Sequence, residues 1–398
     1  MNLLLAQTAE VLFNDGIEEY NKENYRNAVT LLTNSLKLDS NIKETYLHRG
    51  ISYSMLNEYD NALNDFNKAI ELDSNYSKAY LNRGITNYVL NKNKKALKDF
   101  TKVIDLDSNY SLAYFNRGSV FLELKMYNKA ISDYYKVLEV ETDYERIHFN
   151  LGIVYFELDD YTSALEEYNK AIELDSNFID ALINRGLVYY YLEDYYKALS
   201  DYTKAINLNK FIADTYFFRG NVYYDIKDYK EAITDFTKTL EINKNFIYAY
   251  VNRGLSYNDL KEYKKAIEDY NKAINLKPDD AFVYVNRGIA YYYLKNYYIA
   301  IDDFTIAIEL KPDIAISYYN RGIVYHELKR YKEAIEDYSK TIDLNPDYAE
   351  AYNCRGMAYF DIKKYKKAIE DWEKTIELNV EFESELRPYI DEAKKELE

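Results

Sequence analysis

The stretch Tyr284-Val285-Asn286-Arg287-Gly288 recurs in variant form along this chain, and its glycine decides the fold. The chain has eleven glycines, and each follows the previous one by 34 residues: Gly16, Gly50, Gly84, Gly118, Gly152, Gly186, Gly220, Gly254, Gly288, Gly322 and Gly356. If the glycine is position 8 of a repeat, eleven repeats fill residues 9–382. A fixed period of this length indicates one supersecondary unit stacked many times.

Other positions recur as regularly as the glycine. Position 20 is alanine in all eleven repeats, position 24 is aromatic in ten, and position 17 is tyrosine in ten. Apolar residues recur at spacings of three and four in two blocks per repeat, which predicts two helices. In repeat 9 the blocks cover 282–294 and 299–310, with a polar turn between them. We expect the glycine to face the alanine at position 20, and Asp313 to cap the following helix.

These positions, with an aromatic residue at 11 and prolines at 32 in three late repeats, resemble the tetratricopeptide repeat family. The resemblance covers nearly the whole chain. It implies an all-α fold, a right-handed α-α superhelix (a TPR solenoid), in which the first helices line a concave groove and the second helices lie outside.

We therefore expect three kinds of segment along the chain. Residues 1–8 extend the first helix. Residues 383–398 form a C-terminal capping helix, with Leu386, Ile390, Ala393 and Leu397 on one face. Between them lie the repeats 9–42, 43–76, 77–110, 111–144, 145–178, 179–212, 213–246, 247–280, 281–314, 315–348 and 349–382.

The composition argues against several classes of function. The net charge is -16, whereas binding to phosphate backbones needs an excess of basic residues, so we expect no nucleic-acid partner. Nothing resembles a transmembrane span, so we expect no membrane partner and take a cytoplasmic location as the default. The glycine spacing leaves no phosphate-binding glycine loop. The single cysteine, Cys354, cannot form an intrachain disulfide.

No group of residues predicts catalysis. The three histidines, His48, His148 and His326, lie in separate repeats and form no metal-ligand cluster with Cys354. The carboxylates fall on solvated or repeating positions, without a pair suited to acid–base chemistry. We expect no enzyme activity, no cofactor and no metal.

Positions 7 and 23 change together. Position 7 is arginine in nine repeats and position 23 is aspartate in nine, and both exceptions fall in the same two repeats: Asp15 with Leu31, and Leu151 with Glu167. This covariation predicts a charge-assisted pair within each repeat, with a structural role.

Position 6 is the main functional candidate. It is asparagine in eight repeats, and by the geometry of the family it points into the groove. A carboxamide offers two donors and an acceptor, which suits a peptide backbone. The row is similar to the asparagine ladder in the superhelix of O-linked N-acetylglucosamine transferase. The alternative is that these side chains cap or bridge neighbouring helices. The predicted peptide-binding ladder is Asn82, Asn116, Asn150, Asn184, Asn252, Asn286 and Asn320.

The groove wall is expected to combine aromatic residues at position 12 with carboxylates at position 13. This chemistry suits an extended segment that carries aromatic and basic residues. The predicted wall residues are Tyr88, Phe156, Tyr190, Tyr224, Tyr292, Asp225, Asp259 and Glu327.

The sequence thus predicts a non-catalytic protein–protein interaction scaffold that binds an extended peptide segment in its concave groove. The alternative is a structural repeat protein that self-assembles into homo-oligomers and has no groove ligand, which the apolar run Leu3-Leu4-Leu5 motivates. The family's clamp for the carboxylate of chaperone C-termini has lysine at position 5 and arginine at position 6. No repeat carries either, so we expect no such ligand.

Overall fold

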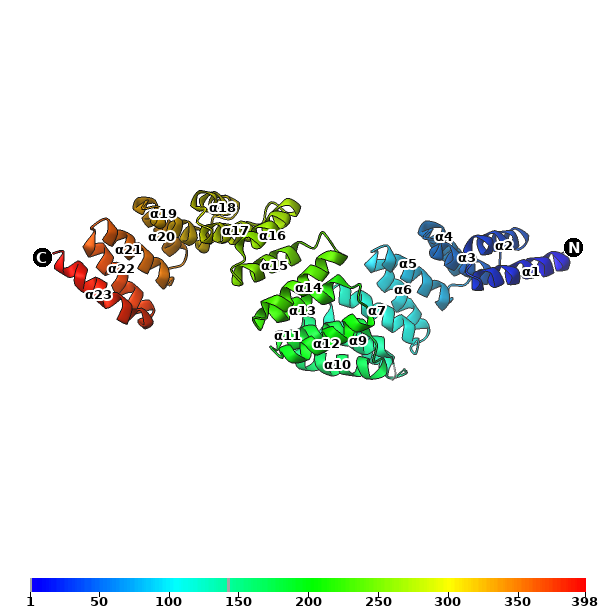
Figure 1. Ribbon diagram of the computed structural model, residues 1–398. Coiled ribbons are helices and arrows are strands. Elements are labelled where there is room, and N and C mark those ends of the chain that lie inside the picture. Colours follow the sequence, from blue (N-terminus) through cyan, green and yellow to red (C-terminus); the bar gives the residue numbers. More distant parts are fainter. Residues whose placement is uncertain (1, 142–143) are drawn as a thin grey trace. The chain divides into compact units, whose positions relative to one another are not determined.

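The computed structural model describes the backbone of residues 2–141 and 144–398, and the side chains of 8–141 and 144–398. It contains two compact units, Met1–Leu192 and Glu193–Glu398, and each is described by itself. The secondary structure of these described residues is entirely helical, and successive helices lie side by side within each unit (Figure 1). The side chains of Leu3, Leu4 and Leu5, on which the self-assembly alternative depends, lie outside the described residues.

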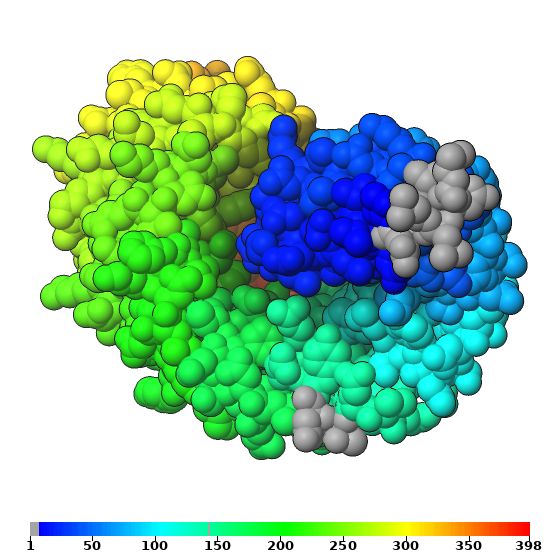
Figure 2. Space-filling model, turned by 90° about the vertical axis from the view of Figure 1, so that its right-hand side faces the viewer, coloured from blue at the N-terminus to red at the C-terminus, as the bar shows by residue number. Residues whose placement is uncertain are grey.

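The N-terminal unit contains the helices α1 (Asn2–Asn21), α2 (Tyr25–Leu38), α3 (Lys43–Met55), α4 (Tyr59–Leu72), α5 (Ser77–Val89), α6 (Asn93–Leu106), α7 (Ser111–Glu123), α8 (Tyr127–Leu138), α9 (Glu145–Glu157), α10 (Tyr161–Leu174) and α11 (Ile179–Tyr191). Each repeat supplies a first and a second helix that pack against each other, as α3 and α4 do. Figure 2 shows the surface of this unit running without a break from the first helices (blue) to α7 (cyan).

The C-terminal unit contains α12 (Tyr195–Leu208), α13 (Ala213–Asp225), α14 (Tyr229–Ile242), α15 (Ile247–Asp259), α16 (Tyr263–Leu276), α17 (Ala281–Tyr293), α18 (Tyr297–Leu310), α19 (Ala315–Glu327), α20 (Tyr331–Leu344), α21 (Ala349–Asp361), α22 (Tyr365–Leu378), a short 3-10 helix η1 (Val380–Phe382) and α23 (Glu383–Lys395). The prediction of an all-α fold of tandem helix pairs is confirmed. None of the helices formed by the described residues has an apolar run long enough to cross a bilayer.

The turn between the two helices of a repeat is closed by backbone hydrogen bonds. In repeat 9, Lys295 N donates to Tyr292 O (2.8 Å) and Asn296 N donates to Tyr291 O (2.9 Å). Lys295 has φ 61°, in the left-handed region, so this is the Schellman arrangement in which glycine is the usual residue. Every repeat places a non-glycine residue there with a positive φ: Glu23, Asn57, Asn91, Lys125, Asp159, Glu193, Lys227, Lys261, Lys295, Lys329 and Lys363.

The expected cap at Asp313 is wrong. The residue that precedes α19 is Ile314, and no side chain caps this helix. Asp280 does cap α17, where its carboxylate accepts from Phe282 N (3.1 Å). The capping residue is at position 34 in both repeats, and it is aspartate before α17 but isoleucine before α19, whereas Asp313 lies at position 33.

The glycine packs against the side chain at position 24. A methyl group on Gly288 would come within 2.8 Å of Phe304 Cε1, and one on Gly152 within 2.5 Å of Tyr168 Cε1. The three atoms nearest to such a methyl group belong to the ring of position 24. The alanines are fully buried, but the ring occupies the space that the missing side chain leaves.

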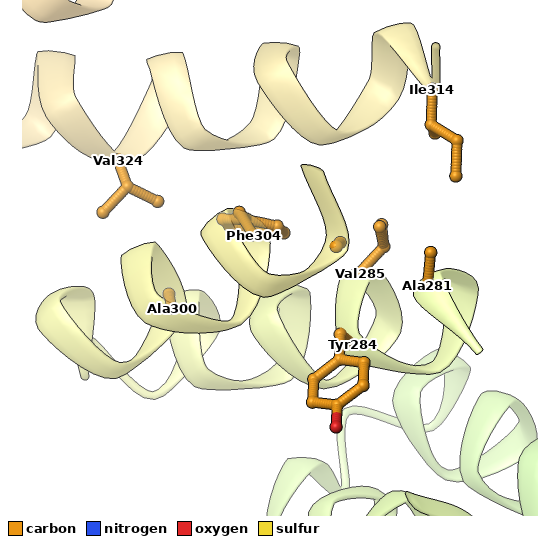
Figure 3. Close-up of a cluster of buried hydrophobic side chains, with 8 residues drawn as sticks. Ala281, Tyr284, Val285, Ala300, Phe304, Ile314 and Val324 are labelled. Atoms are coloured by element: carbon orange, nitrogen blue, oxygen red, sulfur yellow. The ribbon is translucent and has the colours of Figure 1, made fainter. Parts of the chain in front are cut away.

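The second helix of repeat 9 lies between two first helices. In repeat 9, Phe304 of α18 is 1% exposed and packs with Val285 of the preceding α17 and Val324 of the following α19 (Figure 3). Burying a large apolar side chain stabilises a fold by about 1.5–3 kcal/mol. Since each ring contacts two repeats, the same burial joins the helices of a repeat and joins the repeat to its neighbour.

The Arg–Asp pairs form as predicted. Arg287 donates from Nε to Asp303 Oδ2 (2.9 Å) and from Nη2 to Asp303 Oδ1 (2.6 Å), a bidentate pair between α17 and α18. The same two bonds occur in Arg49–Asp65, Arg83–Asp99, Arg117–Asp133, Arg219–Asp235, Arg253–Asp269, Arg321–Asp337 and Arg355–Asp371.

A third bond from each arginine reaches the previous repeat, and it was not predicted. Arg321 Nη1 donates to Thr305 Oγ1 (3.0 Å), at position 25 of repeat 9. The acceptors before the other arginines are Thr33, Asn67, Thr101, Asn169, Thr203, Thr237, Asn271 and Ser339. Position 25 is Tyr135 in repeat 4, and the following repeat has Leu151 in place of the arginine. Position 25 thus changes together with position 7 of the next repeat, and this covariation is the sequence signal for the bond between repeats.

Repeat 5 uses a different buried pair. Glu167 occupies the aspartate position, is 4% exposed, and lies 2.6 Å from His148 Nδ1, while Lys170 Nζ donates to its other oxygen (2.8 Å). The histidine on α9 thus replaces the missing arginine as the partner of the carboxylate.

The last helix covers the end of the core. Leu386, Ile390 and Ala393 of α23 are buried against Trp372 of α22. Leu397 was expected on the same face, but it lies beyond the end of the helix and is 55% exposed. The polar remainder of α23 faces solvent.

Candidate functional site

Four ladder asparagines share one geometry. Their Nδ2 donates to the carbonyl four residues earlier in the same first helix: Asn82 to Lys78 (2.8 Å), Asn116 to Leu112 (2.7 Å), Asn184 to Asp180 (2.8 Å) and Asn320 to Ile316 (2.8 Å). All four side chains are half-buried. The bond uses one of the two amide hydrogens. It leaves each carboxamide held in one orientation, with its oxygen and its second hydrogen available to a ligand.

The other three ladder asparagines lie in different surroundings. Asn252 donates to Asn221 Oδ1 of the preceding repeat (2.8 Å), which is the bridging role weighed as the alternative. Asn150 hydrogen-bonds the Tyr134 hydroxyl. The backbone carbonyl of Asn286 accepts from Asn258 Nδ2 (3.5 Å), and its side chain lines a cavity described below. The ladder is therefore regular in position but not in its contacts.

The predicted wall residues are joined across repeats. The Tyr224 hydroxyl at position 12 donates to Asp259 Oδ2 at position 13 of the next repeat (2.8 Å). Tyr88 hydrogen-bonds Glu123 in the same way; burial and this bond raise the pKa of Tyr88 to about 12. His326 Nε2 lies 2.9 Å from Asp361 Oδ2 at the equivalent positions. The two tyrosine hydrogen bonds each hold a carboxylate in place on the first helices.

Where position 13 is tyrosine, rings take the place of this link. Tyr293 stacks on Tyr263, with ring centres 5.0 Å apart and planes 8° apart. Tyr191 stacks on Tyr161 (5.8 Å, 16°), and the predicted wall residue Phe156 meets Tyr191 edge-on (5.6 Å). The remaining wall rings, Tyr190 and Tyr292, contact the neighbouring tyrosine at position 13 (5.9 and 5.3 Å). The wall carboxylates Asp225, Asp259 and Glu327 are exposed.

One cavity brings three predicted residues together. It has a volume of about 630 Å³ within the C-terminal unit and is lined by Tyr224, Asp259 and Asn286. Asn258, Tyr263 and Tyr293 line it as well and were not predicted. The 34-residue periodicity places these six residues at positions 6, 12, 13 and 17 of repeats 7–9. The cavity therefore lies where the family resemblance expects the groove.

Asn258 contributes to the wall of this cavity. Asn258 Nδ2 donates to the Tyr270 hydroxyl (3.0 Å), whereas Asn258 Oδ1 is buried without a hydrogen-bond partner. The acceptor that the cavity offers to a ligand is the exposed carboxylate of Asp259, of which Oδ2 already accepts from the Tyr224 hydroxyl.

The arrangement is suited to binding rather than to a reaction. The cavity holds carboxamides, phenols, one carboxylate and Lys261, without a nucleophile paired to a base. Within residues 8–141 and 144–398, no three His, Cys, Asp or Glu side chains gather as a metal site would require. Cys354 lies 3.7 Å from the Tyr319 hydroxyl, and burial raises the pKa of its thiol, which keeps it in the unreactive form.

Stacked helix pairs with a constant period and repeated inter-repeat bonds define an α-solenoid of helix-turn-helix units. A model of the tetratricopeptide repeat matches residues 44–76, 179–211, 213–246, 281–314, 315–348 and 349–382, and a second model, described as TPR repeat, matches 118–159, 153–192 and 254–295. The chain belongs to the tetratricopeptide repeat family. Membership supports a role as a protein-interaction scaffold.

Solved structures with the same fold include the APC/C hetero-tetramer Cut9–Hcn1, which is 13% identical over 97% of this chain and 96% of that one, with a TM-score of 0.50. Yeast Tom70 is 17% identical over 98% and 96% (TM-score 0.42). YrrB, described as a TPR protein with an unusual peptide-binding site, is 24% identical over 46% and 95% (TM-score 0.42). Comparison with curated protein sequences finds no match.

Proposed function

We propose that this chain is a non-catalytic scaffold that binds an extended segment of a partner protein along its asparagine ladder. The observation that carries the proposal is the cavity of repeats 7–9. There Asn286 of the ladder, Asn258 and the Asp259 carboxylate line one space with tyrosine rings. An extended peptide has backbone N–H donors for the acceptors and side chains for the rings.

The partner segment carries basic and aromatic residues. Asp259 and Lys261 make the lining of the cavity neutral, so the preference for basic residues comes from the exposed carboxylates Asp225 and Glu327 and from the net charge of -16. Long-range attraction of this kind mainly raises the association rate and falls as salt is added. Aromatic side chains of the segment find rings in the wall, where aromatic pairs add about 0.5–1.5 kcal/mol beyond burial.

A library of short labelled peptides, screened by fluorescence polarisation against the full chain, tests the proposal. Peptides with basic and aromatic residues are expected to bind, and the four-site variant Asn82→Ala, Asn116→Ala, Asn252→Ala and Asn286→Ala is expected to bind them at least about tenfold more weakly, since each lost bond to the ligand contributes about 0.5–1.5 kcal/mol.

A matched control changes four exposed loop asparagines to alanine: Asn75, Asn109, Asn177 and Asn245. This control variant is expected to bind like the wild type. Equal peptide affinity of the wild type and the ladder variant would contradict the proposal, as would a preference for acidic peptides.

A further inference from the structure

Repeat 3 breaks the pattern of position 11. This position carries an aromatic ring in repeats 2 and 4–11, but Asn87 in repeat 3. In repeat 4 the ring lies beside two cations: Arg117 Cζ is 5.8 Å and Lys129 Nζ 5.5 Å from the centre of the Phe121 ring. The lysines at position 19 of repeats 8 and 11 lie over their rings at 5.2 and 5.3 Å. Repeat 3 keeps the cations and lacks the ring.

A cavity of about 280 Å³ occupies that place. It is lined by Arg83, Asn87, Lys95, Lys98 and Asp99 of repeat 3 and by Asn67 of repeat 2. Asn87 is 4% exposed, and its Nδ2 donates to Asp99 Oδ2 (3.3 Å).

Lys98 adds a cation that other repeats lack. It occupies position 22, and no other repeat has a basic residue there: the equivalents are Thr30, Asn64, Ser132, Glu166, Ser200, Thr234, Glu268, Asp302, Glu336 and Glu370. Repeat 3 is thus the one repeat that combines two lysines on this face with a missing ring. The two lysines and the missing ring can be read from the sequence, and their positions 11, 19 and 22 differ from the ladder and wall positions 6, 12 and 13.

The charge of the cavity is positive in an acidic chain. Three cations and one carboxylate line it, so the lining carries 3 - 1 = +2. The carboxylate of Asp99 is committed, because Arg83 Nε and Nη2 bond its two oxygens at 3.0 and 2.6 Å. Within the described chain, the ammonium groups of Lys95 and Lys98 have no carboxylate partner. Two uncompensated ammonium groups beside a guanidinium form a local site for an anion.

We propose that this cavity binds a phosphate group. A phosphate monoester carries a charge of about -1.5 to -2 at neutral pH, which matches the lining, and its oxygens accept charge-assisted hydrogen bonds from ammonium and guanidinium groups. The carboxamides of Asn67 and Asn87 add neutral groups at the wall. The site lies between repeats 2 and 3 and is independent of the peptide groove.

Isothermal titration calorimetry of the full chain at constant ionic strength tests the proposal, with inorganic phosphate, O-phosphoserine and serine as probes. Saturable binding of a phosphate-containing probe, but not of serine, is expected. Preference for O-phosphoserine would assign the site to a phosphorylated ligand, and preference for inorganic phosphate to the free ion. The variant Lys95→Gln/Lys98→Gln is expected to bind at least about tenfold more weakly. Asn87→Tyr, which restores the ring of the other repeats, is expected to abolish binding by filling the cavity.

Lys129→Gln/Lys265→Gln provides the matched control, since these lysines occupy position 19 beside an intact ring. It removes the same charge and is expected to leave phosphate binding unchanged. Absence of binding to the wild type, undiminished binding to Asn87→Tyr, or an equal loss in the control variant would each overturn the proposal. Circular dichroism confirms that each variant is folded.

Discussion

Arg287 and Asp303 form a bidentate pair between the two helices of repeat 9, and the same guanidinium donates through Nη1 to Asn271 of repeat 8. The side chains are 17% and 3% exposed. Burial raises the pKa of Asp303 in spite of the guanidinium beside it. The desolvation of the carboxylate therefore offsets much of the attraction, and the pair mainly determines which helix faces meet.

Breaking this pair is expected to be far more damaging than replacing it. Arg287→Met leaves the Asp303 carboxylate buried without a partner, which costs about 3–5 kcal/mol, whereas Arg287→Met/Asp303→Leu removes both charges and is expected to lie within about 1 kcal/mol of the wild type. Urea unfolding of the full chain and amide exchange of α17 and α18 measure the difference. A double variant as unstable as the single one would show that the pair itself is strongly stabilising.

The third arginine bond is expected to couple neighbouring repeats. Thr305→Val keeps the shape of the side chain but removes the acceptor for Arg321 Nη1, at a cost of about 1–2 kcal/mol. Because Thr305 and Arg321 lie in different repeats, the unfolding transition should also become broader. The control is Thr234→Val, whose hydroxyl bonds only its own helix at Lys230 O and is exposed, so a change below about 0.5 kcal/mol is expected. Equal effects of the two substitutions would contradict the coupling.

Whether Gly288→Ala raises or lowers the free energy of unfolding is expected to depend on Phe304. In the wild type the new methyl group meets the ring, and such overpacking typically costs 1–3 kcal/mol, which exceeds the gain of about 1 kcal/mol in helix propensity. In a Phe304→Ala background the ring is absent, so Gly288→Ala is expected to stabilise by about 1 kcal/mol. The denaturant midpoints of the wild type, Gly288→Ala, Phe304→Ala and the double variant measure the two effects. Destabilisation in both backgrounds would place the cost elsewhere than in the ring contact.

Repeat 5 is expected to lose stability at acid pH. Burial raises the pKa of Glu167, but the hydrogen bonds with His148 and Lys170 outweigh it and hold the pKa below the ordinary value of 4.5. A lowered pKa contributes stability above the unfolded value, and that contribution is lost as the pH falls through the folded value. Amide protection in α9 and α10, corrected for intrinsic exchange, should therefore fall between about pH 5 and about pH 3.

The other repeats provide the comparison for this pH dependence. Burial raises the pKa of Asp303, so the contribution of this carboxylate has the opposite sign and is not lost over the same range. As the pH falls over this range, amide protection in α17 and α18 should decrease less than in α9 and α10. Glu167→Gln is expected to remove the difference between the two repeats, and a variant that keeps it would rule out Glu167 as its source.

Covariation within one sequence predicted the Arg–Asp pairs because Leu151 and Glu167 break both positions in the same repeat. The third bond leaves a similar trace at Tyr135, but it appears only when position 25 is compared with position 7 of the next repeat. The contact of the glycine with the ring at position 24 was not predicted, because periodicity gives the face of a helix and not the reach of a side chain. The cap at Asp313 was misplaced because the capping position is 34 and Asp313 lies at position 33.

For the candidate site, the sequence supplied the positions and not the contacts. The ladder at position 6 and the wall at positions 12 and 13 follow from the period and the family geometry. The bond of Asn82 to its own helix and the bond of Asn252 to Asn221 depend on side-chain rotamers, which no pattern specifies. Asn258 escaped notice because it replaces an aromatic wall residue, and the cavity that it lines depends on the shapes of several side chains.

The left-handed residue in every helix turn has a consequence for how this chain can evolve. A residue other than glycine or asparagine in that conformation costs about 1–2 kcal/mol, and nine of the eleven repeats carry lysine, glutamate or aspartate there. Changing any of them to glycine relieves strain through the backbone alone. Glycine in a turn can therefore offset part of the stability lost through a substitution on the first helices, without changing the surface of those helices.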